Sequence, residues 1–232
     1  YRGDLRYSTA LMKEVFAAGH KLGWQMCCHV TGDAGVEHVL EALEAVNKEF
    51  PITQKRFSLT HAYFPDSDIV KQARRLGVCV DTQSSLYYKD SDAMAEIYGK
   101  NWAERFIGLG SWYHGGVPVA INGDHMMGLN PDTAMNAYNP FLMLYVAVSR
   151  KNRAGRIYGP HQKLTRNEAL RCVTTNAAYL GFDETKKGSL EPRKLADLAV
   201  LDRDYLTCPE EEIRKIKVVM TILNGRVVHT RE

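Results

Sequence analysis

Short apolar runs and longer amphipathic stretches alternate along the first part of the chain. The run Met26-Cys27-Cys28-His29 lies between two glycines and is mostly apolar or small. Such a run predicts a strand buried on both faces, as in a parallel sheet covered by helices. The stretches beside it carry apolar residues three and four positions apart, which is typical of helices. The first helix is expected over Ser8–Ala18, with Ser8 as N-cap and Gly19 as the residue that ends it. The second is expected to begin with Asp33 as N-cap and to be terminated by Pro51.

The same alternation continues through three further apolar runs. They predict strands over Arg56–His61, Val78–Thr82 and Val117–Ile121. A helix that begins at Asp66 and ends before Gly77 is expected between the first two of these strands. The last two are separated by a longer, aromatic-rich segment over Gln83–Gly116, in which a helix is expected around Ala93–Phe106. Strands that alternate with helices predict an α/β fold with a parallel sheet.

The pattern changes in the last part of the chain. A helix is expected over Phe141–Val148, and a capping box from Thr165 to Glu168 opens another that runs through Ala178 and is closed by Gly181. After about Gly188, Leu195–Leu201 and Val218–Leu223 are β-rich, and Asn224-Gly225 is a strong hairpin signal. The pattern therefore predicts an α/β domain over residues 1–188 and a small β segment over residues 189–232.

Composition and charge exclude several classes of protein. The 232 residues are 45% hydrophobic and 25% charged, which is ordinary for a globular protein, and the net charge of +3 comes from Lys and Arg scattered among Asp and Glu. We therefore expect neither nucleic acid nor a membrane as a partner. Five cysteines, an odd number, indicate buried, unpaired thiols in a reducing compartment, so a cytoplasmic location is expected. The chain opens with Tyr1, as a piece of a longer protein would.

Three of the four predicted strands end in a potential metal ligand: His29, His61 and Asp124. They are separated by one and two βα units, which are typically ~30 residues long, so the three side chains are expected to line one rim of the sheet. Imidazole and carboxylate groups bind a divalent metal such as zinc and leave an open position for water. A metal lowers the pKa of that water from about 15.7 toward about 7, and Asp124 is placed to accept its proton.

A plainer interpretation is that these polar residues only cap the loops after the strands. His20, His38 and His161 are interpreted as surface or helix-face residues. Asp33, and His114 and His125 in loops of the proposed active face, are expected to line a substrate pocket.

Several short motifs carry a family resemblance. They are His29-Val30-Thr31-Gly32-Asp33, Thr60-His61-Ala62, Gly123-Asp124, Asn139-Pro140-Phe141, Ala177-Ala178-Tyr179, Lys187-Gly188-Ser189-Leu190-Glu191, the run Lys194–Asp202, and Asn224-Gly225-Arg226-Val227-Val228. Together they resemble the second half of the metal-dependent amidohydrolase superfamily, in particular the branch that includes N-substituted formamide deformylases. The resemblance covers essentially all 232 residues.

The resemblance implies half of a (β/α)8 TIM barrel, strands five to eight, followed by part of a β-sandwich. It implies metal-dependent hydrolysis of an amide or related non-peptide C–N bond through a metal-activated water, with zinc as the expected metal. His29 would be the ligand on strand five and His61 the ligand on strand six. Asp124, on strand eight, would be both ligand and catalytic base.

The sequence departs from the family pattern at several places. Thr60 stands where this branch usually has Glu, and Asn122 where it usually has Ser. The His-x-His pair of the first barrel strand and the bridging residue of strand four are not in this chain. The alternative function is therefore a non-catalytic fragment or pseudoenzyme that acts as a scaffold or small-molecule binding surface.

The half-barrel interpretation also predicts partners. Besides a small amide-type substrate, we expect either the missing N-terminal half or a second copy of the chain, and hence a homo-oligomer. Four strands do not close a barrel, so apolar inner faces would be exposed. The residues expected on these faces are Met26, Cys28, Val78, Val80, Val119 and Ile121.

Overall fold

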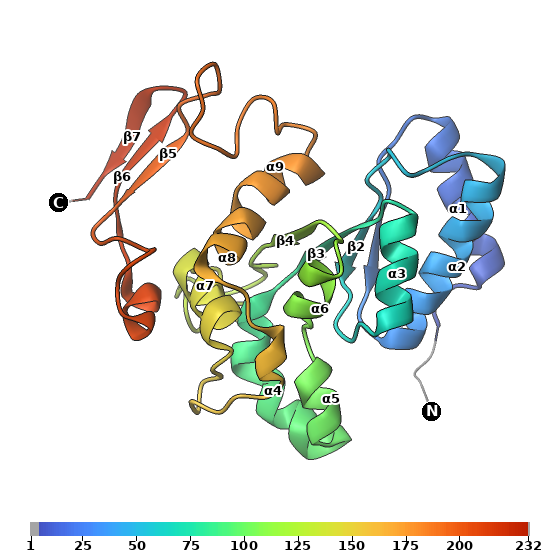
Figure 1. Cartoon of the computed structure of the whole chain (residues 1–232), viewed down its shortest axis with the longest axis horizontal. Coiled ribbons are helices and arrows are strands. Elements are labelled where there is room, and N and C mark those ends of the chain that lie inside the picture. The colour runs from blue at the N-terminus through green and yellow to red at the C-terminus, as the bar shows by residue number, and fades with distance from the viewer. Residues whose placement is uncertain (1–4, 232) are drawn as a thin grey trace. The chain divides into compact units, whose positions relative to one another are not determined.

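The computed structural model describes residues 5–231, and the chain divides into two compact units (Figure 1). Unit 1 contains the residues up to Thr82, Asp90–Val119 and Tyr158–Gln162. Unit 2 contains Gln83–Lys89, Ala120–Ile157 and the residues from Lys163 onward. The predicted division at residue 188 stays a prediction.

Unit 1 is built on a parallel sheet. Its strands are β1 (Cys27–Val30), β2 (Ser58–His61), β3 (Cys79–Thr82) and the first residue of β4 (Val119–Ile121), in the order β1-β2-β3-β4. β1 pairs with β2, and β2 with β3, in parallel register. The predicted α/β fold with a parallel sheet is confirmed.

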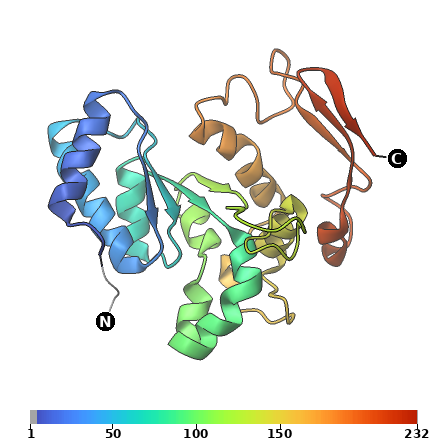
Figure 2. The ribbon, with the colours of Figure 1, turned by 180° about the vertical axis from the view of Figure 1, so that it is seen from behind.

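Helices precede and follow these strands, as Figures 1 and 2 show from opposite sides. They are α1 (Thr9–Lys21), α2 (Asp33–Glu49), α3 (Ser67–Arg75), the end of α4 (Ser84–Tyr98), α5 (Lys100–Arg105), α6 (Leu109–His114) and the short 3-10 helix η1 (Pro160–Gln162). The apolar stripe of α2 is buried, from Val36 to Val46. Burial of this stripe stabilises the helix, because an amphipathic face contributes more than intrinsic propensity.

The predicted burial of the first strand is wrong. In β1, Cys27 and His29 are exposed, and only Val30 is buried. β1 stands at one end of the strand order, so it has a neighbouring strand on one side alone among the described strands. The apolar run therefore predicted a strand correctly, but it did not show that this strand lies at one end of the strand order.

Two predicted helix signals of unit 1 also need correction. Ser8 is the N-cap of α1, as predicted, but the helix continues past Gly19 to Lys21. A Cβ at Gly19 would come within 2.1 Å of the Met26 sulfur, so the Met26 side chain packs directly against this glycine inside the helix. Asp33 does not cap α2, because Gly32 occupies the N-cap position and Asp33 is the first helical residue.

The excursion after β3 holds more helix than predicted. Its first helix, α4, begins at Ser84, well before the expected start at Ala93, and Gly99 with a φ of 92° separates it from α5. The polar opening Gln83-Ser84-Ser85 precedes the expected helix, yet all three side chains are buried. Burial of polar residues is not visible in a hydrophobic pattern.

Unit 2 contains α7 (Pro140–Ser149), α8 (Arg166–Val173) and α9 (Thr175–Leu180). The predicted capping box between Thr165 and Glu168 is confirmed. The single helix expected beyond it is interrupted at Thr174, which has a φ of −126° and a ψ of −89°. The Thr174 hydroxyl donates to the carbonyl of Leu170 at 2.7 Å, a back-bond that bends helices.

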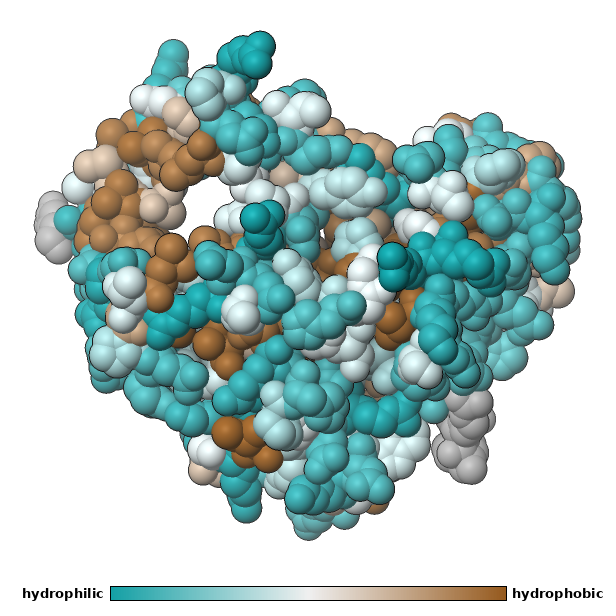
Figure 3. All heavy atoms as spheres, viewed as in Figure 1, coloured by the Kyte–Doolittle hydropathy of each residue, from teal (hydrophilic) through white to brown (hydrophobic). Residues whose placement is uncertain are grey.

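The C-terminal segment of unit 2 forms an antiparallel sheet. β5 (Leu198–Leu201), β6 (Val218–Leu223) and β7 (Arg226–Thr230) are in sequence order, and the 3-10 helix η2 (Glu210–Lys215) precedes β6. Asn224 and Gly225 join β6 to β7 with φ values of 48° and 76°, which confirms the predicted hairpin. All residues of β7 are exposed, and Figure 3 shows apolar surface, in brown, over this part of unit 2.

The expected exposure of the inner strand residues is largely wrong. Val78, Val80 and Val119 are fully buried within this chain, and Ile121 is nearly so, whereas Met26 and Cys28 are half-buried. The apolar layer is therefore already covered except next to β1.

The five cysteines are free thiols, as expected, but Cys27 is exposed, and only Cys79 and Cys172 are fully buried. Within residues 5–231, no helix is long and apolar enough to cross a membrane.

Candidate functional site

Two of the predicted ligands form a pair in unit 1. His29 on β1 and His61 at the end of β2 lie one position apart in the parallel register. Their ring centroids are 4.4 Å apart, and the ring planes meet at 78°. The His61 side chain is buried at 4% exposure, whereas His29 is exposed. The sheet thus holds one imidazole inside and presents the other at the surface.

The backbone at His61 is held in an unusual conformation. His61 has a φ of 79° and Ala62 a φ of 45°, in the left-handed region that favours glycine. Such strain persists only where the surroundings enforce it, and here two buried donors do so. The Thr82 hydroxyl donates to the His61 carbonyl at 2.7 Å, and the Trp112 indole N–H donates to the Ala62 carbonyl at 3.0 Å. Strain of this kind is often found at functional sites.

Tyr63 fixes the orientation of the buried imidazole. Its hydroxyl lies 3.2 Å from Nδ1 of His61, and the two ring centroids are 5.3 Å apart. For Nε2 of His61 to bind a metal, Nδ1 must carry the proton and donate it to the tyrosine oxygen. Tyr63 was not among the residues predicted from the sequence. The one feature of the sequence that points to Tyr63 is its position two residues after the histidine at a strand end.

The histidine pair has the donor chemistry of a metal site but does not complete one. Two neutral imidazoles suit a borderline divalent cation. Burial raises the pKa of the nearby Cys28 thiol, and Cys27 raises it further, so Cys28 is a neutral thiol at pH 7. Among the described residues, no group of three or more His, Cys, Asp or Glu side chains is placed to hold a metal ion.

Asp124 belongs to unit 2, in the loop between β4 and α7, residues 122–139. Its φ is 44°, so it shares the left-handed conformation of His61. Two asparagines hold it. Asn122 Oδ1 accepts from the Asp124 N–H at 2.7 Å, and Asn136 Nδ2 donates to the Asp124 carbonyl at 2.6 Å and to its carboxylate at 3.0 Å. Convergence of Asp124 with the histidines stays a prediction.

His125 follows Asp124 in the same loop, as expected. Its Nδ1 lies 3.4 Å from the carbonyl of Asn136, and its ring contacts Tyr138 at a centroid distance of 4.3 Å. Asn136 therefore contacts both residues, a role that was not predicted from the sequence.

The other predicted pocket residues lie elsewhere. His114 is the last residue of α6, before β4, so the expectation that it lies in a loop is wrong. The Asp33 carboxylate accepts from the N–H of Ala34 at 2.7 Å, at the start of α2. Their role in lining a substrate pocket stays a prediction.

Thr60, one of the residues that depart from the family pattern, has a partner on the neighbouring strand. The Thr60 hydroxyl lies 2.9 Å from the Cys27 sulfur across the β1–β2 pair. The hydroxyl is therefore engaged by the neighbouring strand.

Known proteins resemble this chain over most of its length. N-substituted formamide deformylase of Arthrobacter pascens is 27% identical over 226 residues, which cover 97% of this chain and 40% of that protein. The putative amidohydrolase YtcJ of Bacillus subtilis strain 168 is 24% identical over 212 residues, 90% of this chain and 38% of that protein. The chain thus spans about 40% of the length of the first of these relatives.

Solved structures share the fold. The crystal structure of an uncharacterized metal-dependent hydrolase from Pyrococcus horikoshii OT3 matches with a TM-score of 0.73 at 20% identity, over 90% of this chain and 40% of that one. The family model described as the amidohydrolase family matches residues 3–229. With this match over nearly its whole length, the chain belongs to the amidohydrolase family.

Proposed function

We propose that the complete protein of which this chain is part hydrolyses an amide or related non-peptide C–N bond with the help of a divalent metal, zinc being the expected ion. The observation that carries this proposal is the His29–His61 pair at adjacent strand ends, 4.4 Å between ring centroids. The names of two similar proteins support it, since one is a formamide deformylase and the other a metal-dependent hydrolase. In the barrel of such an enzyme, the four parallel strands would be strands five to eight.

Each candidate residue has a separate task in this proposal. His29 and His61 would hold the cation, and Tyr63 would keep His61 in the tautomer that offers Nε2. A bound divalent cation would lower the pKa of a water and polarise the substrate carbonyl. Asp124 would accept a proton from that water and return it to the leaving amine, while Asn136 orients its carboxylate.

The test uses the complete protein and an N-substituted formamide as substrate, with release of formate as the readout. We expect turnover that a chelator abolishes and zinc restores. His29→Ala should lower metal affinity and turnover, and it leaves the fold intact because His29 is exposed. His161→Ala, a change at another exposed histidine of unit 1, is the matched control. Equal turnover in both variants would refute the assigned metal site.

The alternative is a scaffold or small-molecule binding surface without catalysis. It is favoured by the finding that the described residues hold a histidine pair but no grouped third ligand. The two functions differ in the same assay. A complete protein that binds the formamide but releases no formate at any zinc concentration would support the alternative.

A partner belongs to the same proposal, either the missing N-terminal half or a second copy of the chain. β1 is an end strand with exposed Cys27 and His29, and an end strand offers backbone groups to another strand. Sedimentation of the chain should show concentration-dependent self-association. A monomer at all concentrations would exclude the homo-oligomer.

A further inference from the structure

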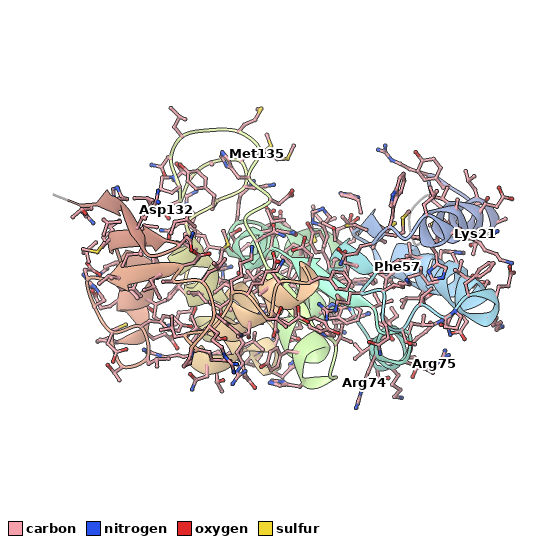
Figure 4. The ribbon with its side chains drawn as sticks, turned by 90° about the horizontal axis from the view of Figure 1, so that it is seen from above. Lys21, Phe57, Arg74, Arg75, Asp132 and Met135 are labelled. Atoms are coloured by element: carbon pink, nitrogen blue, oxygen red, sulfur yellow. The ribbon has the colours of Figure 1, made fainter. Side chains whose placement is uncertain are left out.

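We propose that a pocket in unit 2 binds the carboxylate group of a small molecule. The pocket has a volume of about 170 Å³, enough for a carboxylate and a few carbons. It lies between the first turns of α4 and the loop that follows β4, and Arg153 completes it. Its polar lining includes Ser85, Lys89, Asp132 and Arg153. Figure 4 labels Asp132 and Met135 in this loop.

Ser85 provides the first sign of a ligand. The side chain is 3% exposed, and its hydroxyl has no hydrogen-bond partner among residues 5–231. A buried hydroxyl without a partner is costly, and such groups are rare in folded proteins. The neighbouring Ser84 hydroxyl, by contrast, donates to the carbonyl of Met143 at 2.8 Å. A ligand oxygen in the pocket would accept the hydrogen bond that Ser85 lacks.

Two cations provide the second sign. Lys89 Nζ donates to the carbonyl of Met135 at 2.9 Å, which holds the ammonium group beside the pocket with two further N–H donors. The Arg153 side chain has no hydrogen-bond or ion-pair partner within the described part of the chain, although its backbone N–H donates to the carbonyl of Tyr88 at 2.9 Å. Guanidinium and ammonium groups beside a hydroxyl donor match an oxyanion.

The charge of the pocket selects among oxyanions. Lys89 and Arg153 are opposed by Asp132, whose Oδ1 accepts from Asn139 Nδ2 at 2.7 Å. Two positive charges and one negative charge favour a singly charged ligand. The Asp132 carboxylate repels a phosphate dianion more strongly than a carboxylate. The apolar side chains of Leu86, Ala134 and Ala137 suit the short carbon chain that carries the group.

The pocket shares its loop with the proposed catalytic residue. Met135 and Ala137 line it, and Asn136 between them donates to Asp124. A carboxylate seated there would fix the position of the same loop segment that orients Asp124. The use of the pocket as a substrate subsite rests on the proposed function. The binding itself does not.

The experiment measures binding of propionate and of inorganic phosphate to the 232-residue chain by NMR titration at constant ionic strength. We expect saturable propionate binding that is at least about threefold tighter than phosphate binding. Arg153→Met should weaken propionate binding about tenfold, the loss expected for one charged hydrogen bond. Ser85→Ala should weaken it about threefold. Arg171→Met, at an exposed arginine of α8 outside the pocket, should leave it unchanged.

Stability separates a ligand site from a structural serine. Ser85→Ala removes an unsatisfied hydroxyl, so the melting temperature of the free protein should stay the same or rise. Absence of saturable binding, tighter binding of phosphate, or equal weakening by Arg171→Met would overturn the proposal. Propionate binding without amide hydrolysis by the complete protein would contradict the proposed function alone. Hydrolysis without propionate binding would contradict the carboxylate pocket alone.

Discussion

The histidine pair and the Asp124 loop are supported in different ways. His61 ends a strand of the parallel sheet, and donors from distant segments, Thr82 and Trp112, hold its turn. Asp124 follows a strand as well, but its bonds come from Asn122 and Asn136 within one loop. Both residues have a positive φ.

This difference separates two properties of a site. Long-range donors tie the histidine pair to the core, so its geometry is lost only when the sheet itself is disturbed. Local asparagine bonds leave the Asp124 loop able to vary in length and sequence without a cost to the core. We therefore expect the backbone support of His61 to matter most for stability, and the Asp124 loop to matter most for proton transfer and choice of ligand.

The largest effect is expected on turnover, from the loop. Asp124→Asn in the complete protein should lower kcat by about 10²–10⁴, because general-base catalysis contributes about that much. Metal content should remain, since the two histidines are unchanged. Steady-state kinetics and metal analysis of the purified variant test this. Near wild-type kcat would remove Asp124 from the mechanism.

The next effect is expected on stability, from the support of the pair. Thr82→Val keeps the shape of the side chain but leaves the buried His61 carbonyl without its donor, so the free energy of unfolding should fall by about 1–3 kcal/mol. Urea denaturation measures the change. Thr53→Val, at an exposed threonine of unit 1, serves as the control and should change it by less than about 0.5 kcal/mol. Equal changes in both variants would show that the turn is not held by Thr82.

A smaller effect on stability is expected inside the loop. Asn136→Ala removes both donations to Asp124, yet the freed oxygens are only partly buried and can bind water. The free energy of unfolding should therefore fall by about 1 kcal/mol, the usual net value of a hydrogen bond. The same denaturation assay applies. A loss above that of Thr82→Val would reverse the comparison.

The smallest effect is expected at the exposed apolar residues of the loop. Met127 is 61% exposed, so Met127→Ser should change the free energy of unfolding by no more than a surface substitution does, which is within about 0.5 kcal/mol. Thermal unfolding of the variant tests this. A larger drop would mean that the loop buries more apolar surface than its exposure indicates.

The sequence predicted the parts that depend on local patterns. The strand end at His61, a strand end one residue past His29, the capping box at Thr165 and the hairpin at Asn224 all follow from residues close together in the chain. The contacts of Tyr63 and Asn136 were missed because they depend on how turns fold back on a strand end.

Long-range burial was also beyond local patterns. Gln83 and Ser85 are polar but buried, and the helix that begins beside them at Ser84 was expected only around Ala93. Val78 and Val80 were expected to be exposed in an open half-barrel, but they are covered within the chain. A pattern of apolar residues shows that a strand has a face to bury and does not show which segment covers it.

The parallel pairing of β1 with β2 has a consequence for the order of folding. Parallel strands need a crossover connection, and the connection between β1 and β2 contains the whole of α2. Helix formation within α2 is a local event and precedes this distant pairing, because loop closure costs entropy that local contacts avoid. We therefore expect the two imidazoles to meet in a late step of folding. A cation that requires both of them would bind the finished sheet far better than any earlier intermediate, and would slow unfolding more than it speeds folding.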